Sequence, residues 1–225
     1  MTDQLENADL TWRDGTVPVA TRFDDPYYSL ADGLSETRHV FLAGNDLPAR
    51  FFPGFRVAEL GFGTGLGVLT AWAAWEATGQ AGPLRVTSFE AFPMSHADMA
   101  RALAPFDAIA DQRDRLLGAF DPDAGRAVLP TLDLTVIHGD ARVTLPAWNG
   151  SADAWFLDGF APARNPELWG PALMQDVAGH TAPGGTFATY TAAGHVRRAL
   201  SDAGFAVARA PGFGRKRHMT RGVLG

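Results

Sequence analysis

The segment Val57–Gly67 constrains the fold of this chain most strongly, because an apolar run there meets an acid and passes directly into glycines. The turn itself, Glu59–Gly65, reads Glu-Leu-Gly-Phe-Gly-Thr-Gly, and a helical pattern follows it. Glycines allow a sharp turn and a close approach of the backbone to a ligand, while the free N–H groups of the next helix face that ligand. The segment therefore predicts a strand, a tight turn and a helix around a nucleotide-like ligand.

The spacing of these glycines excludes two common nucleotide fingerprints. A dinucleotide site needs glycine at the first, third and sixth places, whereas Leu66 holds the sixth place counted from Gly61 and Val68 holds it counted from Gly63. A P-loop would end in Gly-Lys-Ser/Thr, and Lys216 is the only lysine of the chain. A turn that uses glycine only for tight packing stays open as an alternative.

From Phe55 onward, short apolar runs that end in acids or glycines alternate with helical stretches, which is the pattern of an α/β protein with a doubly wound, mostly parallel sheet. The expected strands are Arg56–Leu60, Arg85–Phe89, Asp133–Ile137, Ala154–Leu157, Thr186–Thr191 and Phe205–Arg209. The expected helices are Leu66–Thr78, Ser95–Ala104, Gly170–Thr181 and Ala193–Ala203. A further apolar segment, His218–Leu224, is expected to return as an antiparallel partner of the last strand.

The first fifty residues differ from the rest, since they are polar and rich in aspartate and turn formers. We expect residues 1–50 to be an N-terminal extension packed on a main domain of residues 51–225. Within the extension, residues 22–28 are expected to form a loop with exposed aromatic side chains, and residues 36–42 a strand or a short helix. A chain of 225 residues with 46% hydrophobic residues is long enough to bury one substantial core.

The composition excludes several kinds of chemistry. With no cysteine, the chain has no disulfides, no cysteine-ligated metal and no thiol nucleophile, and its six histidines are scattered without metal-ligand spacing, so no metal is expected. The N-terminus is acidic and polar where a secretory signal would be basic and then apolar, and no apolar run reaches membrane-spanning length. We therefore expect a cytoplasmic protein that does not enter a membrane.

The formal charge of −6 is distributed unevenly along the chain. Residues 197–221 carry seven basic side chains against one acid, Asp202, so this stretch is locally +6 and the other 200 residues carry −12. A basic patch on an acidic body is expected where a polyanion docks on one face, whereas a solvated edge whose arginines pair with carboxylates is the open alternative. The basic residues are Arg197, Arg198, Arg209, Arg215, Lys216, Arg217 and Arg221.

Four acids stand at or just after the ends of expected strands. They are Glu59, Glu90, Asp140 and Asp158. Ligands of open α/β sheets bind outside the carboxyl ends of the strands, so these side chains are expected to converge on one crevice. Glu90 follows the second strand of the series, where an acid accepts hydrogen bonds from the ribose hydroxyls of a bound nucleoside.

The compact Glu-x-Gly-x-Gly-x-Gly turn resembles motif I of class I methyltransferases. Three segments are similar to the methyltransferase domain of the bacterial MnmC proteins and their stand-alone MnmD relatives, namely Ala58–Leu66, Asp153–Pro166 and Gly212–Arg217. Asp24 and Asp25 with Tyr27, and the segment Gly33–Leu42, resemble the N-terminal extension of that family, so the likeness covers nearly the whole chain. Arg164 and His195 depart mildly from the family, which often has Lys and Phe there.

This resemblance implies a class I methyltransferase with a Rossmann-like sheet that uses S-adenosyl-L-methionine. The implied reaction methylates the 5-aminomethyl group of wobble 5-aminomethyl-2-thiouridine in tRNA and gives 5-methylaminomethyl-2-thiouridine. Fused members of the family carry a second, FAD-dependent oxidase domain. Because the chain stops at Gly225 and has no second glycine fingerprint, we expect the oxidase activity to be absent.

The resemblance also assigns roles to residues. The expected cofactor site comprises Glu59, Gly61, Gly63, Thr64, Gly65, Glu90, Gly139, Asp140 and Asp158, with Asp140 where methyltransferases hold the adenine amino group. Asp158 is the expected catalytic residue, which orients the amine and helps to remove its proton. An aromatic residue among Phe23, Tyr27 and Phe160 is expected to stack on the base. The residues expected to meet phosphates of the anticodon stem-loop are Arg164, Arg197, Arg198, Arg215, Lys216 and Arg217.

Three other functions stay open at this point. The same fold and cofactor would serve a methyltransferase of another amine, of a small molecule or of a protein, because fold does not fix substrate. A non-catalytic RNA-binding or nucleotide-binding module would keep the fold without turnover, and a nicotinamide oxidoreductase is the third option. The sequence implies no oligomeric state.

Overall fold

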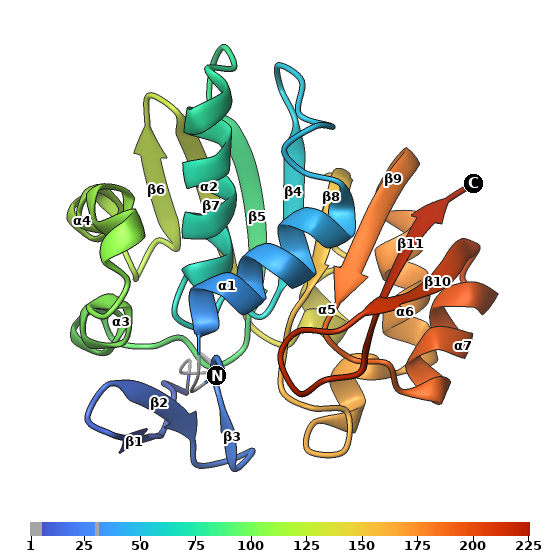
Figure 1. Cartoon of the computed structure of the whole chain (residues 1–225), viewed down its shortest axis with the longest axis horizontal. Coiled ribbons are helices and arrows are strands. Elements are labelled where there is room, and N and C mark those ends of the chain that lie inside the picture. The colour runs from blue at the N-terminus through green and yellow to red at the C-terminus, as the bar shows by residue number, and fades with distance from the viewer. Residues whose placement is uncertain (1–5, 30–31) are drawn as a thin grey trace.

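The computed structural model describes residues 6–29 and 32–225 (Figure 1). In this part of the chain the strands form a large sheet in the order β10-β11-β9-β8-β4-β5-β7-β6. The parallel strands are β4 (Arg56–Leu60), β5 (Leu84–Glu90), β7 (Leu132–His138), β8 (Ala152–Leu157) and β9 (Thr181–Thr189). Strand β11 (His218–Leu224) runs antiparallel to both β9 and β10 (Phe205–Pro211), and β6 (Arg126–Leu129) runs antiparallel to β7. The predicted fold class, a mostly parallel α/β sheet with an antiparallel C-terminal strand, is confirmed.

Helices cover both faces of this sheet. Figure 1 shows α1 and α2 in front of the strands and α5, α6 and α7 behind them. The helices are α1 (Gly33–Thr37), α2 (Leu66–Thr78), α3 (His96–Leu103), α4 (Ala110–Ala119), α5 (Ala141–Thr144), α6 (Pro171–Gly179) and α7 (Gly194–Asp202). Helix α1 continues through a π-helical turn, Arg38–Leu42, and a 3-10 turn, Ala43–Asn45.

Two buried hydrophobic clusters hold the layers together, one on each face of the sheet. Along β8, Ala154 and Phe156 belong to the cluster on the α2 side, whereas Trp155 and Leu157 belong to the cluster on the α6 and α7 side. This alternation is what a strand imposes on its side chains, and burial on both faces explains why the central strands are continuous apolar runs. The core therefore fixes the strand ends at which the expected acids stand.

Each predicted strand and helix has a counterpart, with shifts at some ends. Strand β9 begins at Thr181 rather than Thr186, and α6 ends at Gly179 rather than Thr181. Helix α4 and strand β6 were not predicted, because the polar sequence of α4 and the four residues of β6 give weak periodic signals. Of the two options for residues 36–42, the helical one is correct: Phe41 is buried there and its ring stacks on Phe156 at 5.1 Å between centroids.

The expectation of exposed aromatic side chains in residues 22–28 is wrong. This segment contains β3 (Asp25–Pro26), the third strand of a small antiparallel sheet with β1 (Leu10–Arg13) and β2 (Val17–Ala20). Phe23, Tyr27 and Tyr28 are partly buried. The Tyr28 hydroxyl lies within hydrogen-bond distance of the Thr16 carbonyl at 3.0 Å and of the Ala102 carbonyl at 2.8 Å, so the segment is attached to the main domain.

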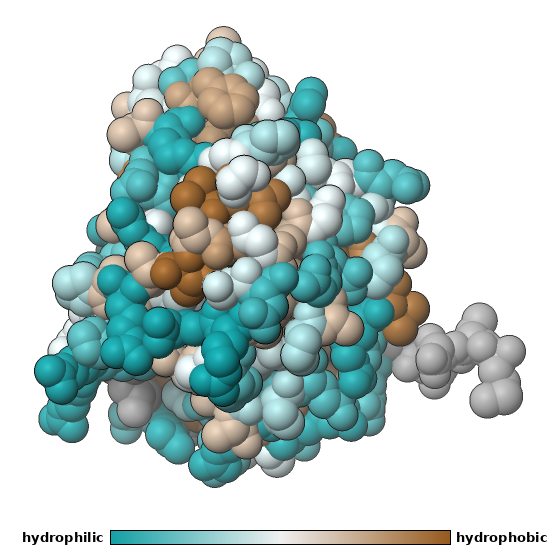
Figure 2. All heavy atoms as spheres, turned by 90° about the vertical axis from the view of Figure 1, so that its right-hand side faces the viewer, coloured by the Kyte–Doolittle hydropathy of each residue, from teal (hydrophilic) through white to brown (hydrophobic). Residues whose placement is uncertain are grey.

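The face that carries β10, β11 and α7 is shown in Figure 2, where hydrophobic side chains gather in the middle and hydrophilic side chains surround them. Val223 of β11 is exposed. Five basic side chains of this C-terminal region are exposed, namely Arg198, Arg209, Arg215, Lys216 and Arg217. No helix in the described residues is long and apolar enough to cross a membrane.

Candidate functional site

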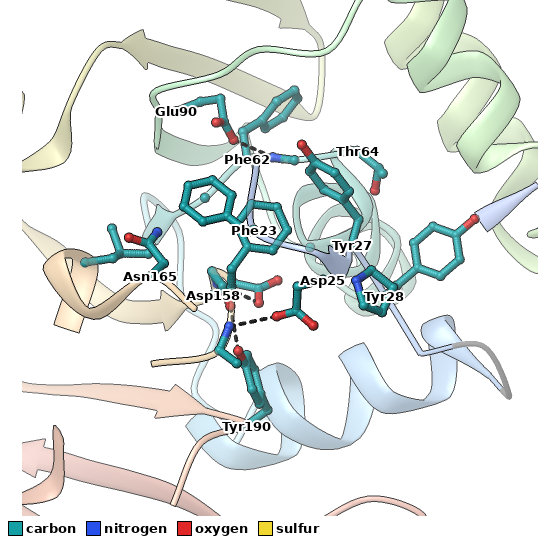
Figure 3. A pocket seen from close by; sticks show the side chains of 18 of the residues that line it. Phe23, Asp25, Tyr27, Tyr28, Phe62, Thr64, Glu90, Asp158, Asn165 and Tyr190 are labelled. Carbon is teal, nitrogen blue, oxygen red and sulfur yellow. Dashed lines mark hydrogen bonds between the residues drawn. The ribbon is translucent and has the colours of Figure 1, made fainter. Parts of the chain in front are cut away.

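A cavity of about 1590 Å³ opens where the carboxyl ends of β4, β5, β7 and β8 meet. Pockets for small molecules commonly measure roughly 300–1,000 Å³, so this one has room for two ligands side by side. Its walls come from the glycine turn, the three loops after the neighbouring strands, α1, residues 22–29 and the loop between β10 and β11. Figure 3 shows Glu90 and Thr64 at one end of the cavity and Tyr190 and Asp25 at the other, with Asp158 near the latter.

The glycine turn adopts a backbone that only glycine enters readily. Gly61, Gly63 and Gly65 have φ values of +86°, +53° and +82°. The turn is also in close contact with its neighbours, since a Cβ on Gly61 would lie 2.9 Å from the backbone oxygen of Asp158. The Gly61 N–H donates to the Phe89 carbonyl at 2.9 Å. The backbone after β4 is therefore held against the ends of both β5 and β8.

Glu90 is the last residue of β5, and its carboxylate is hydrogen-bonded to the glycine turn. Its Oε2 accepts a hydrogen bond from the Gly63 N–H and its Oε1 one from the Phe92 N–H, both at 2.8 Å. Burial raises the pKa of the Glu90 carboxyl, and the backbone amides oppose that rise. Each carboxylate oxygen keeps a further lone pair, so Glu90 still has acceptor capacity for a ligand in the cavity.

Glu59 is placed differently from the other three acids. It is buried and does not line the cavity, and its Oε2 accepts a hydrogen bond from the Ser88 hydroxyl at 2.7 Å. Its Oε1 lies so close to Gly67 that a side chain on that residue would collide with it. Burial raises the pKa of Glu59 well above its usual range. Its contact with the cofactor stays a prediction; in the structure it packs between β4, β5 and the start of α2.

Asp140 lines the cavity after β7. It caps α5, accepting a hydrogen bond from the Arg142 N–H at 2.9 Å, and its carboxylate also pairs with the Arg142 guanidinium. The Arg142 side chain lowers the pKa of Asp140, so the group is ionised at neutral pH. Gly139, beside it, has a φ of +123° and donates its N–H to the Glu90 carbonyl at 2.8 Å. Three of the four predicted acids, Glu90, Asp140 and Asp158, thus share one cavity.

Asp158 follows β8, and its Oδ1 accepts a hydrogen bond from the Gly159 N–H at 2.9 Å. Burial raises the pKa of Asp158 to about 7, and the nearby carboxylates of Glu36 and Asp25 add to the rise while the Lys216 ammonium opposes it. A carboxyl with this pKa exchanges its proton near neutral pH, which suits it to general acid–base work.

The segment after Asp158 is held by the N-terminal residues. Asp25 Oδ2 accepts a hydrogen bond from the Ala161 N–H at 2.8 Å. Phe23 stacks on Phe160 with ring centroids 4.6 Å apart, and Tyr27 meets the same ring edge-on at 5.0 Å. The three aromatic residues predicted to bind substrate are therefore brought together, with Phe23 and Tyr27 both packed on Phe160. Asp25 was not predicted as a site residue, because its partner lies 136 residues away along the chain.

Tyr190 and Glu36 are two further cavity residues that sequence reasoning missed. Tyr190 follows β9 and donates its hydroxyl to the Gly159 carbonyl at 2.7 Å. Lys216 Nζ lies 4.2 Å from the centre of the Tyr190 ring and pairs with the Glu36 carboxylate at 2.8 Å. The position of Tyr190 directly after an apolar strand is the signal that could have identified it.

Only some of the predicted phosphate-binding residues lie at the cavity. Arg215 and Lys216 line the cavity, whereas Arg197, Arg198 and Arg217 do not. Arg164 pairs with Asp24 at 2.9 Å on the surface. Within residues 6–29 and 32–225, His, Asp and Glu form no group of three that could hold a metal ion.

Comparisons with known proteins bear on this site. A family described as "S-adenosyl-L-methionine-dependent methyltransferase" matches residues 123–225. The "tRNA 5-methylaminomethyl-2-thiouridine biosynthesis bifunctional protein MnmC" of Stutzerimonas stutzeri is 44% identical over 233 residues and covers 99% of this chain. The protein of the same name in Chromobacterium violaceum is 45% identical over 229 residues and covers 97%. The chain spans only 35% and 34% of the length of these relatives.

Solved structures show the same fold. The crystal structure of MNMC2 from Aquifex aeolicus superposes with a TM-score of 0.77 at 24% identity, covering 99% of this chain and 72% of its own. A methyltransferase from Pyrococcus furiosus gives a TM-score of 0.54 at 13% identity, covering 97% and 89%. The C-terminal part of the chain is thus similar to S-adenosyl-L-methionine-dependent methyltransferases, and nearly the whole chain is similar to about one third of the MnmC proteins.

Proposed function

We propose that this chain is a tRNA-modifying methyltransferase of the cytoplasm that methylates the 5-aminomethyl group of wobble 5-aminomethyl-2-thiouridine. The observation that carries the proposal is the two-part cavity, in which a glycine turn with Glu90 and Asp140 adjoins Asp158 and a group of aromatic side chains. The MnmC relatives are named for the biosynthesis of 5-methylaminomethyl-2-thiouridine in tRNA, which is the product of the proposed reaction. Their activity comes to this chain as a proposal because the chain spans about a third of their length.

The residues of the first part fit S-adenosyl-L-methionine. Without side chains, Gly61 and Gly63 pack closely against Asp158 and Tyr27, and their backbone lines the cavity. Glu90 offers carboxylate oxygens to ribose hydroxyls, and Asp140 offers an acceptor to the adenine amino group. The bound cofactor supplies an electrophilic methyl group on a sulfonium. The cavity-lining residues from this set are Gly61, Gly63, Thr64, Glu90, Gly139 and Asp140.

Asp158 has the acid–base role in the second part. An alkylammonium has no lone pair, so the amine must lose a proton before its nitrogen can attack. Asp158 orients the amine and accepts that proton directly or through water. The new N–C bond forms as the C–S bond breaks, and the electron pair of the broken bond stays on sulfur. Placing the two reactants side by side in one cavity also contributes to the rate.

The aromatic and basic residues fit an RNA substrate. Phe23 and Phe160 offer rings on which a single-stranded base can stack, since loop bases of RNA are commonly read in this way. Arg215 at the cavity and the exposed Arg198, Arg209 and Arg217 of the C-terminal region would meet phosphates. Arg164 is paired with Asp24 and would have to exchange that partner for a phosphate.

The decisive experiment incubates the protein with methyl-labelled S-adenosyl-L-methionine and tRNA that lacks this last methyl group, and then analyses the nucleosides. We expect label in 5-methylaminomethyl-2-thiouridine. Cofactor binding without labelled tRNA, but with label in free amines or protein, would identify a methyltransferase of another amine. Cofactor or tRNA binding with no transfer to any acceptor would identify a non-catalytic module.

The pH dependence of methyl transfer tests Asp158. A protonated carboxyl cannot accept a proton, so kcat/KM should fall as the pH drops below about 7, the pKa to which burial raises this group. Rates measured between about pH 5.5 and 9 check this, with a ¹³C NMR titration of the aspartate carboxyls as a direct readout. Asp158→Asn should lower the transfer rate by about 100-fold or more and should remove the titrating signal. Near-normal turnover in that variant would remove Asp158 from the mechanism.

A side chain at Gly61 should damage cofactor binding. In Gly61→Ala the Cβ would lie 2.9 Å from the Asp158 carbonyl oxygen, and overpacking of this kind costs about 1–3 kcal/mol. The turn must shift, so the Kd for S-adenosylhomocysteine in calorimetry should rise about tenfold or more. Gly79→Ala is the matched control, since Gly79 at the end of α2 also has a positive φ, +66°, but open space around it. Equal Kd values for both variants would contradict the role of the turn.

Binding of tRNA should depend on Arg215 and on salt. If Arg215 contacts a phosphate, Arg215→Ala should weaken tRNA binding and reduce the slope of log K against log salt by about 1. Filter binding over a salt series measures both quantities. Arg85→Ala is the control, because Arg85 is exposed near the amino end of β5, at the opposite edge of the sheet from the cavity. An unchanged slope in Arg215→Ala would exclude the contact.

A further inference from the structure

Tyr27 lies against the glycine turn. A Cβ built on Gly63 would be 3.0 Å from Cδ1 and 3.4 Å from Cε1 of the Tyr27 ring. The Tyr27 N–H donates to the Pro18 carbonyl at 3.1 Å, which fixes the backbone of the residue to β2. The ring therefore covers the turn from the side of the cavity, and Tyr27 is one of the residues that line the cavity.

The hydroxyl of Tyr27 differs from those of the other two tyrosines. Tyr28 is bonded to two backbone carbonyls and Tyr190 to one, whereas the Tyr27 hydroxyl has no hydrogen-bond partner among residues 6–29 and 32–225. Tyr27 lines the cavity and its hydroxyl is not among the buried unpaired polar atoms of the described residues, so the hydroxyl is accessible and a ligand that supplies an acceptor can pair with it. Burial and the Glu90 carboxylate raise the pKa of Tyr27, so the hydroxyl keeps its proton and remains a donor.

The direction of the Tyr27 hydroxyl indicates whether this residue contacts the cofactor or the substrate base. Figure 3 shows the Tyr27 ring extending toward Phe62, Thr64 and Glu90, at the opposite end of the cavity from Tyr190. Its contact with Phe160 is edge-on, at an interplanar angle of 81°, whereas Phe23 and Phe160 lie with their faces together. Stacking on a base needs a free ring face beside Asp158, and Tyr27 presents its hydroxyl end to the glycine turn instead.

We propose that Tyr27 is a cofactor-binding residue whose hydroxyl donates a hydrogen bond to an oxygen of the bound nucleoside cofactor while its ring closes over the glycine turn. This inference rests on the proposed use of S-adenosyl-L-methionine and moves Tyr27 from the expected base-stacking role to the cofactor half. The accepting oxygen belongs either to the ribose, beside Glu90, or to the carboxylate of the amino-acid moiety, beside Thr64.

The test compares Tyr27→Phe with Tyr28→Phe in the full chain without tRNA. Calorimetry measures the Kd for S-adenosylhomocysteine and for 5′-methylthioadenosine, which keeps the ribose but lacks the carboxylate. Tyr27→Phe should raise the Kd for S-adenosylhomocysteine by about 2- to 10-fold, the usual effect of one lost hydrogen bond, without lowering the thermal midpoint. Tyr28→Phe should lower the thermal midpoint and leave the Kd unchanged, since its hydroxyl bonds only to the Thr16 and Ala102 carbonyls.

The second ligand identifies the accepting oxygen. Weaker binding of both ligands by the same factor assigns the hydrogen bond to the ribose, and weaker binding of S-adenosylhomocysteine alone assigns it to the carboxylate. Unchanged Kd values in Tyr27→Phe would overturn the inference, as would a variant in which only tRNA affinity falls. If the unmodified protein binds neither ligand, the proposed function fails instead, so the two failures are distinguishable.

Discussion

The close contact between the glycine turn and the backbone after β8 is the constraint on which the rest of the site depends. Gly61 lies so near the Asp158 carbonyl that no side chain fits between them, and its N–H is bonded to the end of β5. Because the turn and Asp158 directly follow two neighbouring parallel strands, a ligand at the turn lies next to Asp158. Under the proposed function, this backbone packing would bring the cofactor and the acceptor amine next to each other.

This arrangement gathers carboxylates in a small volume, and their mutual repulsion has to be offset. Backbone N–H groups serve Glu90 and Asp158, and Lys216 supplies the cation nearest to the Asp158 end. The balance leaves Asp158 with a raised pKa. The same burial lowers the pKa of an ammonium placed beside it, because desolvation disfavours both charged forms. The pKa of the Asp158 carboxyl and the pKa of the ammonium therefore approach each other. Under the proposed function, this favours transfer of the proton from the amine to the carboxylate.

The parts of this molecule that follow from local sequence patterns could be predicted, whereas contacts between segments far apart in the sequence could not. Strands such as β8 could be predicted because burial on both faces makes them continuous apolar runs. The turn could be predicted because its glycines, which adopt positive φ, follow one another at fixed spacing. The distribution of charge identified the basic C-terminal stretch but not which of its residues line the cavity. Helix α7 and the loop that holds Lys216 belong to different parts of the fold. Nothing near residue 25 in the sequence indicates that Asp25 holds the Ala161 N–H.

That long-range contact explains why the N-terminal residues, which look like a separate extension in the sequence, complete the site. Within five residues, Phe23 packs on Phe160, Asp25 holds the backbone of Ala161, and Tyr27 lies on Gly63. One short segment therefore touches both the cofactor turn and the loop that follows Asp158. The two halves of the cavity are therefore linked by one continuous stretch of backbone. By thermodynamic reciprocity, any coupling that this linkage creates acts equally in both directions between the two ligands.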